Sequence, residues 1–224
     1  SIDPIPNEIA DAIAFDQDTA VRRYDPDHAH ALWQALVQAD RVLTRFRAGF
    51  KGKASPVHFF WGSFDLATSR FSGRTAPPHP GGMPNFPDDV AREAYSHELT
   101  SAGFWPGNRD SPEPVFYSYA YPTPKGFSTA TVEPPEARWL EDLGEFVLSY
   151  AAVAGGEDPD QYVEVSFKVS ERAFTAWPER IRAAFEPART VRTRRATYRL
   201  ALMSDVARRD SPHADGVISM RGGR

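Results

Sequence analysis

Residues 57–66 read VHFFWGSFDL, an aromatic stretch around which the rest of the fold can be worked out. Phenylalanine, tryptophan and valine favour strands, and Gly62 disfavours a helix, so we predict one continuous strand. Alternation along such a strand places His58 on one face and Trp61 on the other. Because large rings fall on both faces, the pattern indicates a strand that is covered on both sides.

Three further strands are predicted downstream of this stretch. Residues 99–105 and 115–121 are rich in aromatic side chains, and residues 144–150 read GEFVLSY. Proline and glycine punctuate the chain around these segments, which is typical of short strands joined by turns. The sequence therefore predicts a mostly antiparallel, aromatic-rich sheet over residues 56–150.

Helices are predicted before and after this sheet. An Asp-Pro pair at residues 25–26 is a strong helix start, and apolar residues follow at helical spacing, which predicts a helix over residues 26–48. A second Asp-Pro pair favours a helix near residues 158–177, although residues 163–169 also alternate like a strand. Together these elements predict an α+β fold, with the sheet flanked by helices.

One segment between the predicted strands is expected to be a loop. Residues 72–88 contain five Pro and three Gly, which are too many breakers for a helix or a strand. Asp88 or Asp89 then favours the start of a short helix that runs past Arg92 to Tyr95.

The composition places the chain among globular proteins. Of its 224 residues, 41% are hydrophobic and 25% are charged, close to the average for packed domains. No apolar run reaches the roughly 18–20 residues of a membrane span. Without Cys there is no disulfide, thiolate nucleophile or Cys-ligated metal. We therefore expect a soluble, cytoplasmic protein that does not bind membranes.

The last part of the chain differs in charge from the rest. Residues 171–224 contain 12 Arg, no Lys and 6 acidic residues, whereas the preceding residues contain 14 basic and 24 acidic ones. A basic tail could bind nucleic acid, but this one lacks interleaved aromatic residues and any nucleic-acid-binding motif. We predict a single α+β domain over residues 1–177 and a poorly ordered, Arg-rich extension over residues 178–224.

The first candidate function is small-molecule binding in an aromatic pocket. The predicted strands carry more rings than a small core needs, and aromatic walls with a few polar groups are typical of ligand sites. Trp61, His79 and Trp105 are the expected ligand contacts, and Arg70 could hold a carboxylate or phosphate through a bidentate pair. The alternative is an aromatic core whose arginines are solvated or paired with acids.

The second candidate is a metal-dependent or acid–base enzyme. His58, His79 and His97 fall within forty residues of one another, and Glu98 follows the last of them. Imidazole and carboxylate groups bind divalent metals such as zinc and iron, and they also transfer protons. We expect His58 and His97 to face a shared pocket, with Arg70 on the same side as His58. The alternative is that the histidines hydrogen-bond only to loop backbone.

No standard motif decides between these functions. The chain has no phosphate-binding glycine loop, no dinucleotide fingerprint and no serine nucleophile elbow. His97-Glu98 begins like a zinc-protease motif, but Ser101 stands where that motif requires a second His. A structural fragment without activity of its own is a third possibility. Neither the oligomeric state nor a cofactor follows from the sequence.

Several strings in the chain are similar to those of a known family. They are SPVHFFWGSFDLATSRFSGRTAPPHPGG at 55–82, REAYSHELTSAGFWPG at 92–107, PVFYSYAYPTPKGF at 114–127 and LGEFVLSY at 143–150. Through these strings the chain resembles, over residues from about 3 to 177, a bacterial family catalogued as domain of unknown function 5996.

This resemblance implies more about the extent of the chain than about its function. It covers the later part of the family's length, which implies an incomplete domain cut from a larger protein. Ala54 stands where relatives carry Cys, and Ser149 and Ala151 stand where Pro and Asp are expected. No thiol role carries over, and the family has no established activity to transfer.

Overall fold

The computed structural model describes residues 13, 16–21, 23–83 and 86–172 of the chain. The predicted extension over residues 178–224 lies outside the described residues. The chain divides into two units after residue 191, and all described residues belong to the first unit.

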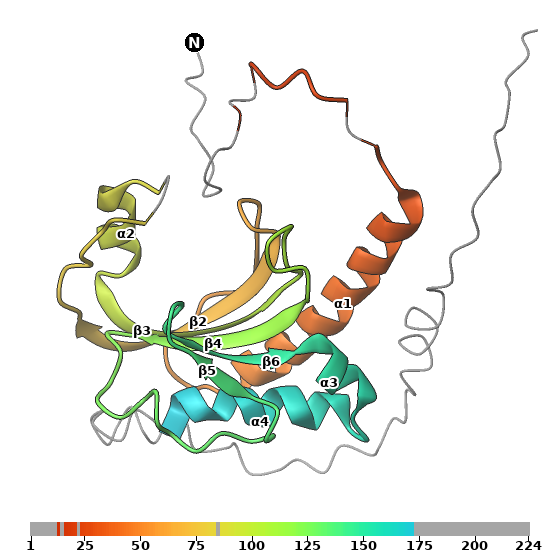
Figure 1. Cartoon of the computed structure of the whole chain (residues 1–224). Coiled ribbons are helices and arrows are strands. Elements are labelled where there is room, and N and C mark those ends of the chain that lie inside the picture. The colour runs from red at the N-terminus through yellow and green to blue at the C-terminus, as the bar shows by residue number, and fades with distance from the viewer. Residues whose placement is uncertain (1–12, 14–15, 22, 84–85, 173–224) are drawn as a thin grey trace, which may run out of the picture. The chain divides into compact units, whose positions relative to one another are not determined.

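Six strands form one antiparallel sheet in the order β1-β2-β3-β4-β6-β5 (Figure 1). Most neighbours in the sheet are also neighbours in the chain, and β6 returns to lie between β4 and β5. The strands are β1 (His58–Phe60), β2 (Asp65–Thr75), β3 (His97–Trp105), β4 (Val115–Tyr121), β5 (Arg138–Leu140) and β6 (Glu145–Ser149). The predicted α+β fold with a mostly antiparallel sheet is confirmed.

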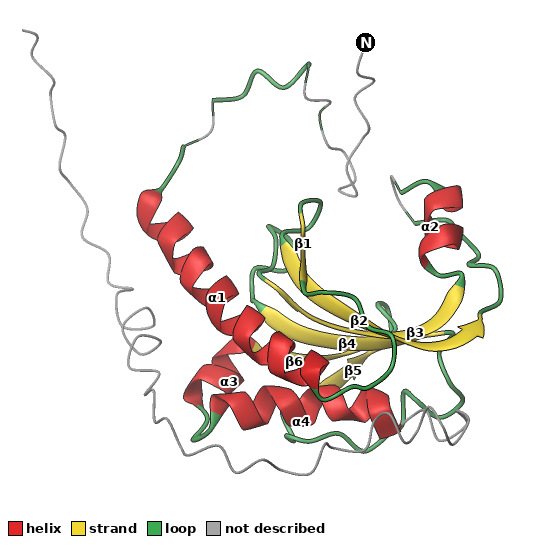
Figure 2. Ribbon diagram, turned by 180° about the vertical axis from the view of Figure 1, so that it is seen from behind, coloured by secondary structure: helices red, strands yellow, loops and turns green. Residues whose placement is uncertain are grey.

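Helices cover one face of this sheet. The described helices are α1 (Pro26–Ala48), α2 (Asp88–Ala94), α3 (Tyr150–Gly155) and α4 (Pro159–Arg172). Helices α1, α3 and α4 pack on the same face, while α2 lies apart beside the end of the sheet (Figure 2). None of the helices in the described ranges is both long and apolar enough to cross a membrane.

Local capping explains where the two long helices begin. The Asp25 carboxylate accepts hydrogen bonds from the backbone N–H groups of Asp27 (2.9 Å) and His28 (3.1 Å), so α1 starts at the predicted residue. The Asp158 carboxylate accepts one from Gln161 N–H (3.1 Å) in the same way at α4. The helix predicted near residues 158–177 is therefore confirmed over residues 159–172, and its last predicted residues lie outside the described ranges. The competing strand interpretation is wrong.

The aromatic stretch VHFFWGSFDL forms a hairpin, so the prediction of one continuous strand is wrong. Strand β1 ends at Phe60, and β2 begins at Asp65 after a four-residue turn. Within this turn Phe64 adopts a positive φ of 62°, and its N–H donates to Phe60 O (2.9 Å). Phe59 packs against the core, whereas Trp61 in the turn is 79% exposed. The stretch is thus not covered on both sides.

Other elements differ from the sequence-based expectation in length or existence. Strand β2 continues to Thr75, into the predicted loop over residues 72–88. In this extension Arg74 forms an ion pair with Glu98 of β3 at 2.7 Å. Strand β5 and helix α3 were not predicted, because three residues and six residues carry too little periodicity. The short helix after the loop is confirmed as α2, but its N-cap residue is Pro87, and Asp88 and Asp89 lie within its first turn.

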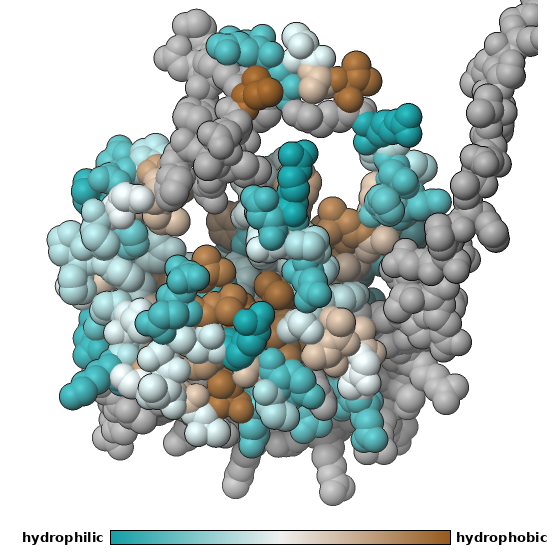
Figure 3. All heavy atoms as spheres, viewed as in Figure 1, coloured by the Kyte–Doolittle hydropathy of each residue, from teal (hydrophilic) through white to brown (hydrophobic). Residues whose placement is uncertain are grey.

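The core lies between the sheet and the three helices on its covered face. Leu43 of α1 and Phe167 of α4 are fully buried against Phe104, Phe116 and Leu148 of the sheet. Large apolar side chains outside this core are interspersed with polar ones on the side of the molecule shown in Figure 3. Scattered exposure of this kind is normal for folded proteins.

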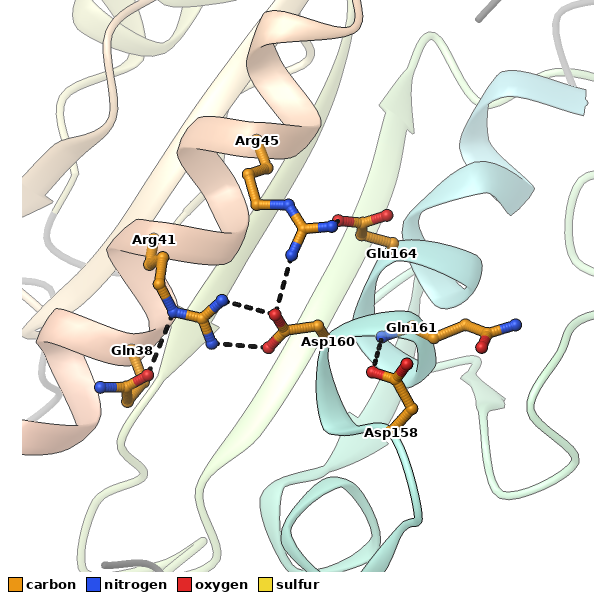
Figure 4. Close-up of polar contacts among 7 residues, drawn as sticks. All are labelled: Gln38, Arg41, Arg45, Asp158, Asp160, Gln161 and Glu164. Atoms are coloured by element: carbon orange, nitrogen blue, oxygen red, sulfur yellow. Dashed lines mark hydrogen bonds and ion pairs between the residues drawn. The ribbon is translucent and has the colours of Figure 1, made fainter. Parts of the chain in front are cut away.

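An ion network joins α1 to α4 on the surface of the helical layer (Figure 4). Arg41 donates to both carboxylate oxygens of Asp160, at 2.5 and 2.6 Å, and Arg45 donates to Asp160 at 2.8 Å. Arg45 also pairs with Glu164 at 2.9 Å. The hydrogen bond from Arg41, ahead of its charge and that of Arg45, lowers the pKa of the Asp160 carboxyl.

We expect Asp160→Asn to lower the free energy of unfolding at pH 7 by about 1 kcal/mol, as measured by urea denaturation. The expected loss of stability is modest because the side chains of Arg41 and Arg45 are 42% and 54% exposed, so water screens the network. A lowered pKa in the folded state stabilises the fold above the unfolded pKa of about 4, and this stabilisation is lost on further acidification. The difference between the variant and the wild type should therefore begin to shrink near pH 4 and disappear only below the lowered pKa of folded Asp160. An equal loss in the exposed-site control Asp142→Asn would contradict this assignment.

Candidate functional site

The face of the sheet opposite α1, α3 and α4 carries most of its polar side chains. Register fixes which residues share this face: Ala67 pairs with Gly103, which pairs with Tyr117, which pairs with Val147. Alternate residues of each strand therefore point the same way. We call this the open face, and it includes Asp65, Ser69, Ser101, Gly103, Tyr117, Tyr119 and Glu145.

Tyr117 lies across the neighbouring strand and reaches the strand beyond it. Its hydroxyl donates to the Asp65 carboxylate at 2.5 Å, although β4 and β2 are separated by β3. This path exists because Gly103, directly opposite Tyr117, has no side chain: a Cβ there would overlap the Tyr117 ring end. Ser63 donates to the other Asp65 oxygen at 2.6 Å. The Asp65 carboxylate is thus held in place from two sides.

We expect Gly103→Ala to lower the free energy of unfolding by about 1–3 kcal/mol, because the new methyl group overpacks this contact. Its Cβ would also lie 2.6 Å from the backbone oxygen of Leu66, which cannot move aside cheaply. Chemical denaturation measures the loss, and the Tyr117 ring signals should shift in NMR spectra. Gly155→Ala is the matched control, since nothing lies within 4 Å of a Cβ at that helical position. Equal stability of the two variants would contradict the close approach.

Tyr119 lies beside Tyr117, two residues further along β4 on the same face of the sheet. The two ring centroids are 6.3 Å apart and the ring planes differ by 15°. The hydroxyls of Tyr119 and Tyr95 share a hydrogen bond of 3.0 Å. Burial raises the pKa of both Tyr117 and Tyr119 well above the usual value, so both phenols stay protonated at neutral pH. We call the pair of rings the tyrosine floor.

Glu145 of β6 borders the tyrosine floor on the side away from Asp65. Burial, and secondly the charge of Asp65, raise the pKa of the Glu145 carboxyl to about 7. No hydrogen bond or ion pair with another described residue holds this carboxyl in its charged form. Near neutral pH the group is therefore present in both protonation states, which allows it either to accept or to donate a proton.

The histidines proposed from the sequence do not share a site. His58 pairs with Ala67 at the outer strand, and Ala67 pairs with Gly103 of β3, whereas His97 is six residues from Gly103. At about 3.3 Å per residue these histidines are separated by roughly 20 Å along the sheet. Within the described ranges, no three His, Asp or Glu side chains gather closely enough to hold a metal ion.

His79 and Glu98 make local contacts where the structure places them. The His79 ring stacks on Tyr95 at 4.8 Å and lies 5.3 Å from the Tyr121 ring, and its Nδ1 accepts from Gly81 N–H at 3.1 Å. The Glu98 carboxylate accepts from Ser72 and Arg74, both at 2.7 Å. Of the two, His79 lies at the end of the open face, beyond the tyrosine floor.

The proposed ligand contacts Arg70, Trp61 and Trp105 are dispersed as well. Arg70 pairs with Thr100 and lies on the helix-covered face, 2% exposed, so the expectation that it shares a face with His58 is wrong. The hairpin turn reverses the alternation between the two residues. Trp61 projects from that turn, and Trp105 lies partly buried at the last position of β3.

The residues that do come together carried only a weak signal in the sequence. Tyr117 and Tyr119 belong to the aromatic run of β4, and their spacing of two already placed them on one face. Gly103 in an aromatic strand was a possible sign of close approach by another group. Nothing local distinguished Asp65 or Glu145 from any other acidic residue at a strand end.

Comparison with known proteins places the chain in a family. Neither the curated proteins nor the solved structures contain a match to it. The profile of one family, described as "Family of unknown function (DUF5996)", matches residues 1–177. This match spans the sheet, all described helices and every residue of the open face. The chain therefore belongs to the family of unknown function DUF5996.

Proposed function

We propose that the chain binds a small organic molecule on the open face, over the tyrosine floor and between Asp65 and Glu145. The observation that carries the proposal is the pair of parallel rings beside two carboxyl groups, on the face that α1, α3 and α4 leave uncovered. Ligand sites typically combine flat apolar walls with a few fixed polar groups. The Tyr117–Asp65 contact supplies such a fixed group.

The energetics of Glu145 support a functional role for this face. A desolvated carboxyl without a partner reduces stability, since burial disfavours its charged form. An apolar residue at this strand position would avoid that cost. Groups that retain a perturbed pKa in this way are concentrated at functional sites, which favours a binding or catalytic role over a purely structural one.

A fragment screen by protein-observed NMR tests the proposal. We expect small ring-containing polar compounds to shift the backbone amides around Asp65, Gly103 and Glu145. Tyr117→Ala removes half of the tyrosine floor and should abolish these shifts. Trp33→Ala is the matched control, because this exposed aromatic residue of α1 lies outside the open face.

Two results would count against binding at this face. One is a set of fragment hits whose shifts cluster elsewhere, for example around the exposed hairpin turn that carries Trp61. The other is a set of hits at the open face whose affinity is unchanged in Tyr117→Ala. Circular dichroism of Tyr117→Ala must first show a folded protein, and Tyr117→Phe, which keeps the ring, serves as the milder variant.

An acid–base enzyme is the second candidate, and the pKa of Glu145 favours it specifically. A carboxyl with a pKa of about 7 suits proton transfer at neutral pH. Glu145, whose pKa is raised to about 7 by burial and by Asp65, would be this group. This proposal replaces the histidine-based site considered from the sequence. Prolonged incubation of fragment hits should then show turnover by NMR. Glu145→Gln should stop turnover while leaving binding in place, and unchanged turnover in this variant would contradict a proton-transfer role.

A further inference from the structure

We propose that the ligand of the open face is an organic cation, an ammonium or guanidinium group attached to a ring or other flat body. This inference rests on the proposed binding function and specifies the chemical class of the ligand. It follows from the shape of the tyrosine floor and from the charges placed around it.

The two rings of the floor lie next to each other with nearly parallel planes. Tyr117 is pressed against Gly103, where a Cβ would collide with the end of its ring, so the ring lies along the sheet. Tyr119 is nearly parallel to it, with 15° between the planes. The face of an aromatic ring carries the negative part of its quadrupole, and cations bind over such faces within about 6 Å of the centroid.

The hydrogen bond to Asp65 strengthens this property of Tyr117. Its phenol donates to a carboxylate at 2.5 Å, which shifts electron density from the O–H bond toward the oxygen and the ring. The donor end of the phenol is also directed away from any ligand. Tyr117 therefore offers an electron-rich ring, and its phenol hydrogen is already bonded to Asp65.

Acidic side chains flank the floor on the strands that carry it and border it. Of the side chains that β2, β3, β4 and β6 place on the open face, Asp65 and Glu145 are the acidic ones, and His97 stands at the far end of β3. Asp65 and Glu145 stand on opposite sides of the tyrosines, on strands whose backbones are roughly 14 Å apart. A cation over the rings would lie between two carboxyl groups, whereas an anion there would be repelled by both.

Basic side chains of the outer strands share this face without an ion pair to Asp65 or Glu145 among the described residues, and His58 of β1 stands opposite Ala67. Register places Arg138 of β5 on the same face as Val147, but it is exposed at the sheet edge. Arg70 lies on the opposite face, and His79 is stacked between Tyr95 and Tyr121 beyond the end of the floor. Because no described basic side chain pairs with either carboxyl, we take both as available to a ligand.

Cation binding should also depend on the protonation of Glu145. Its carboxyl has a pKa of about 7 and faces Asp65, Tyr117 and Tyr119. A bound cation stabilises the charged form, so binding below pH 7 must first displace a proton. Affinity for a cation is expected to rise between pH 6 and pH 8, whereas affinity for a neutral ligand is not.

Three probes that share a phenyl ring and a short chain test the inference: 2-phenylethylammonium, 2-phenylethanol and 3-phenylpropionate. Each is titrated into the full chain at pH 8 and at pH 6, and the amide shifts of β2, β3, β4 and β6 are followed. We expect the ammonium to bind about tenfold more tightly than the alcohol at pH 8, a factor well within the reach of one cation–π contact. The carboxylate should not saturate.

Variants separate the charge effect from ring binding. Asp65→Asn and Glu145→Gln keep the shape of each side chain, and we expect each to reduce the preference for the ammonium over the alcohol. Glu145→Gln should also abolish the change in that preference between pH 6 and pH 8. Glu136→Gln, at an exposed loop position, is the matched control and should leave the preference unchanged.

The outcomes distinguish this inference from the proposed function. Equal binding of ammonium and alcohol, or tighter binding of the carboxylate, overturns the cation inference while ligand binding at the open face stands. A preference for the ammonium that survives in both Asp65→Asn and Glu145→Gln also overturns it. If none of the probes shifts these amides but the fragment screen does, the face binds a different class of ligand and the inference is again wrong.

Discussion

Arg70→Ala is expected to lower the free energy of unfolding by about 3 kcal/mol or more, as measured by urea denaturation at pH 7. The Arg70 side chain is among the largest that are fully buried. Its guanidinium stacks on the Phe46 ring, 3.4 Å from the centroid, and lies 5.3 Å from the Phe50 ring. Truncation leaves a cavity between two aromatic rings and removes a charge-assisted hydrogen bond.

That hydrogen bond explains how a buried positive charge is tolerated here. The guanidinium donates to the backbone oxygen of Phe46, in the last turn of α1. Carbonyl groups at the end of a helix carry the negative part of its dipole, so they partly compensate the charge of Arg70. The position of the guanidinium over the Phe46 and Phe50 rings compensates further, because a guanidinium is weakly hydrated and binds ring faces well.

Two further variants make the Arg70 prediction specific. Arg70→Met retains most of the apolar stem without a charge, and we expect it to cost clearly less than Arg70→Ala. Arg92→Ala, which removes an exposed pair with Asp88, should cost less than about 1 kcal/mol. A loss below about 1 kcal/mol for Arg70→Ala would contradict a structural role. Ligand binding at the open face should be retained in Arg70→Met, because Arg70 lies on the opposite face of the sheet.

Glu145→Gln is expected to stabilise the protein at pH 8 by about 2–3 kcal/mol and to change the pH dependence of stability. The Glu145 carboxyl has a pKa of about 7 in the folded chain, against a reference value of 4.5. Between these values the folded state binds more protons than the unfolded state. The free energy of unfolding must therefore fall as the pH rises through this window.

The size of the effect follows from the shift. Each pKa unit corresponds to about 1.4 kcal/mol, and the partial exposure of Glu145 reduces the total to the range given above. Glutamine is neutral at every pH, so the difference between variant and wild type should be small at pH 4.5 and fully developed at pH 8. Urea denaturation at pH 4.5, 6 and 8 measures this difference.

Glu136→Gln, at an exposed loop position, is the control for the pH series. Its stability curve should parallel that of the wild type, since both chains keep Glu145. If Glu145→Gln also parallels the wild type from pH 4.5 to pH 8, the carboxyl titrates at an ordinary pH. Its use as a proton carrier and the pH dependence of cation binding would then both be excluded.

Helix α1 and strand β4 show what the sequence by itself determined. The side chain of Asp25, the fixed φ of Pro26 and the apolar spacing that follows are local features, and α1 begins and ends at the predicted residues. The run at 115–121 is likewise a strand of the predicted length. In both cases the signals act over a few residues of chain, so no distant contact was needed to define the element.

The relation between His58, Arg70 and the tyrosines was decided only by the tertiary structure. A turn at residues 61–64 reverses which alternate residues face the helices, and this placed Arg70 in the core. The Tyr117–Asp65 contact requires that Gly103 stand opposite Tyr117, which depends on strand register. A shift of register by one residue would place every side chain of a strand on the other face.

The chemistry of Glu145 also depended on its neighbours rather than on its own segment. Its pKa is raised by burial and by Asp65, which is 80 positions earlier in the sequence and three strands away. Charge and desolvation act through space, so residue spacing along the chain does not reveal them. The sequence therefore determined which segments become helices and strands, whereas the packing of distant strands determined which of their side chains form a candidate site.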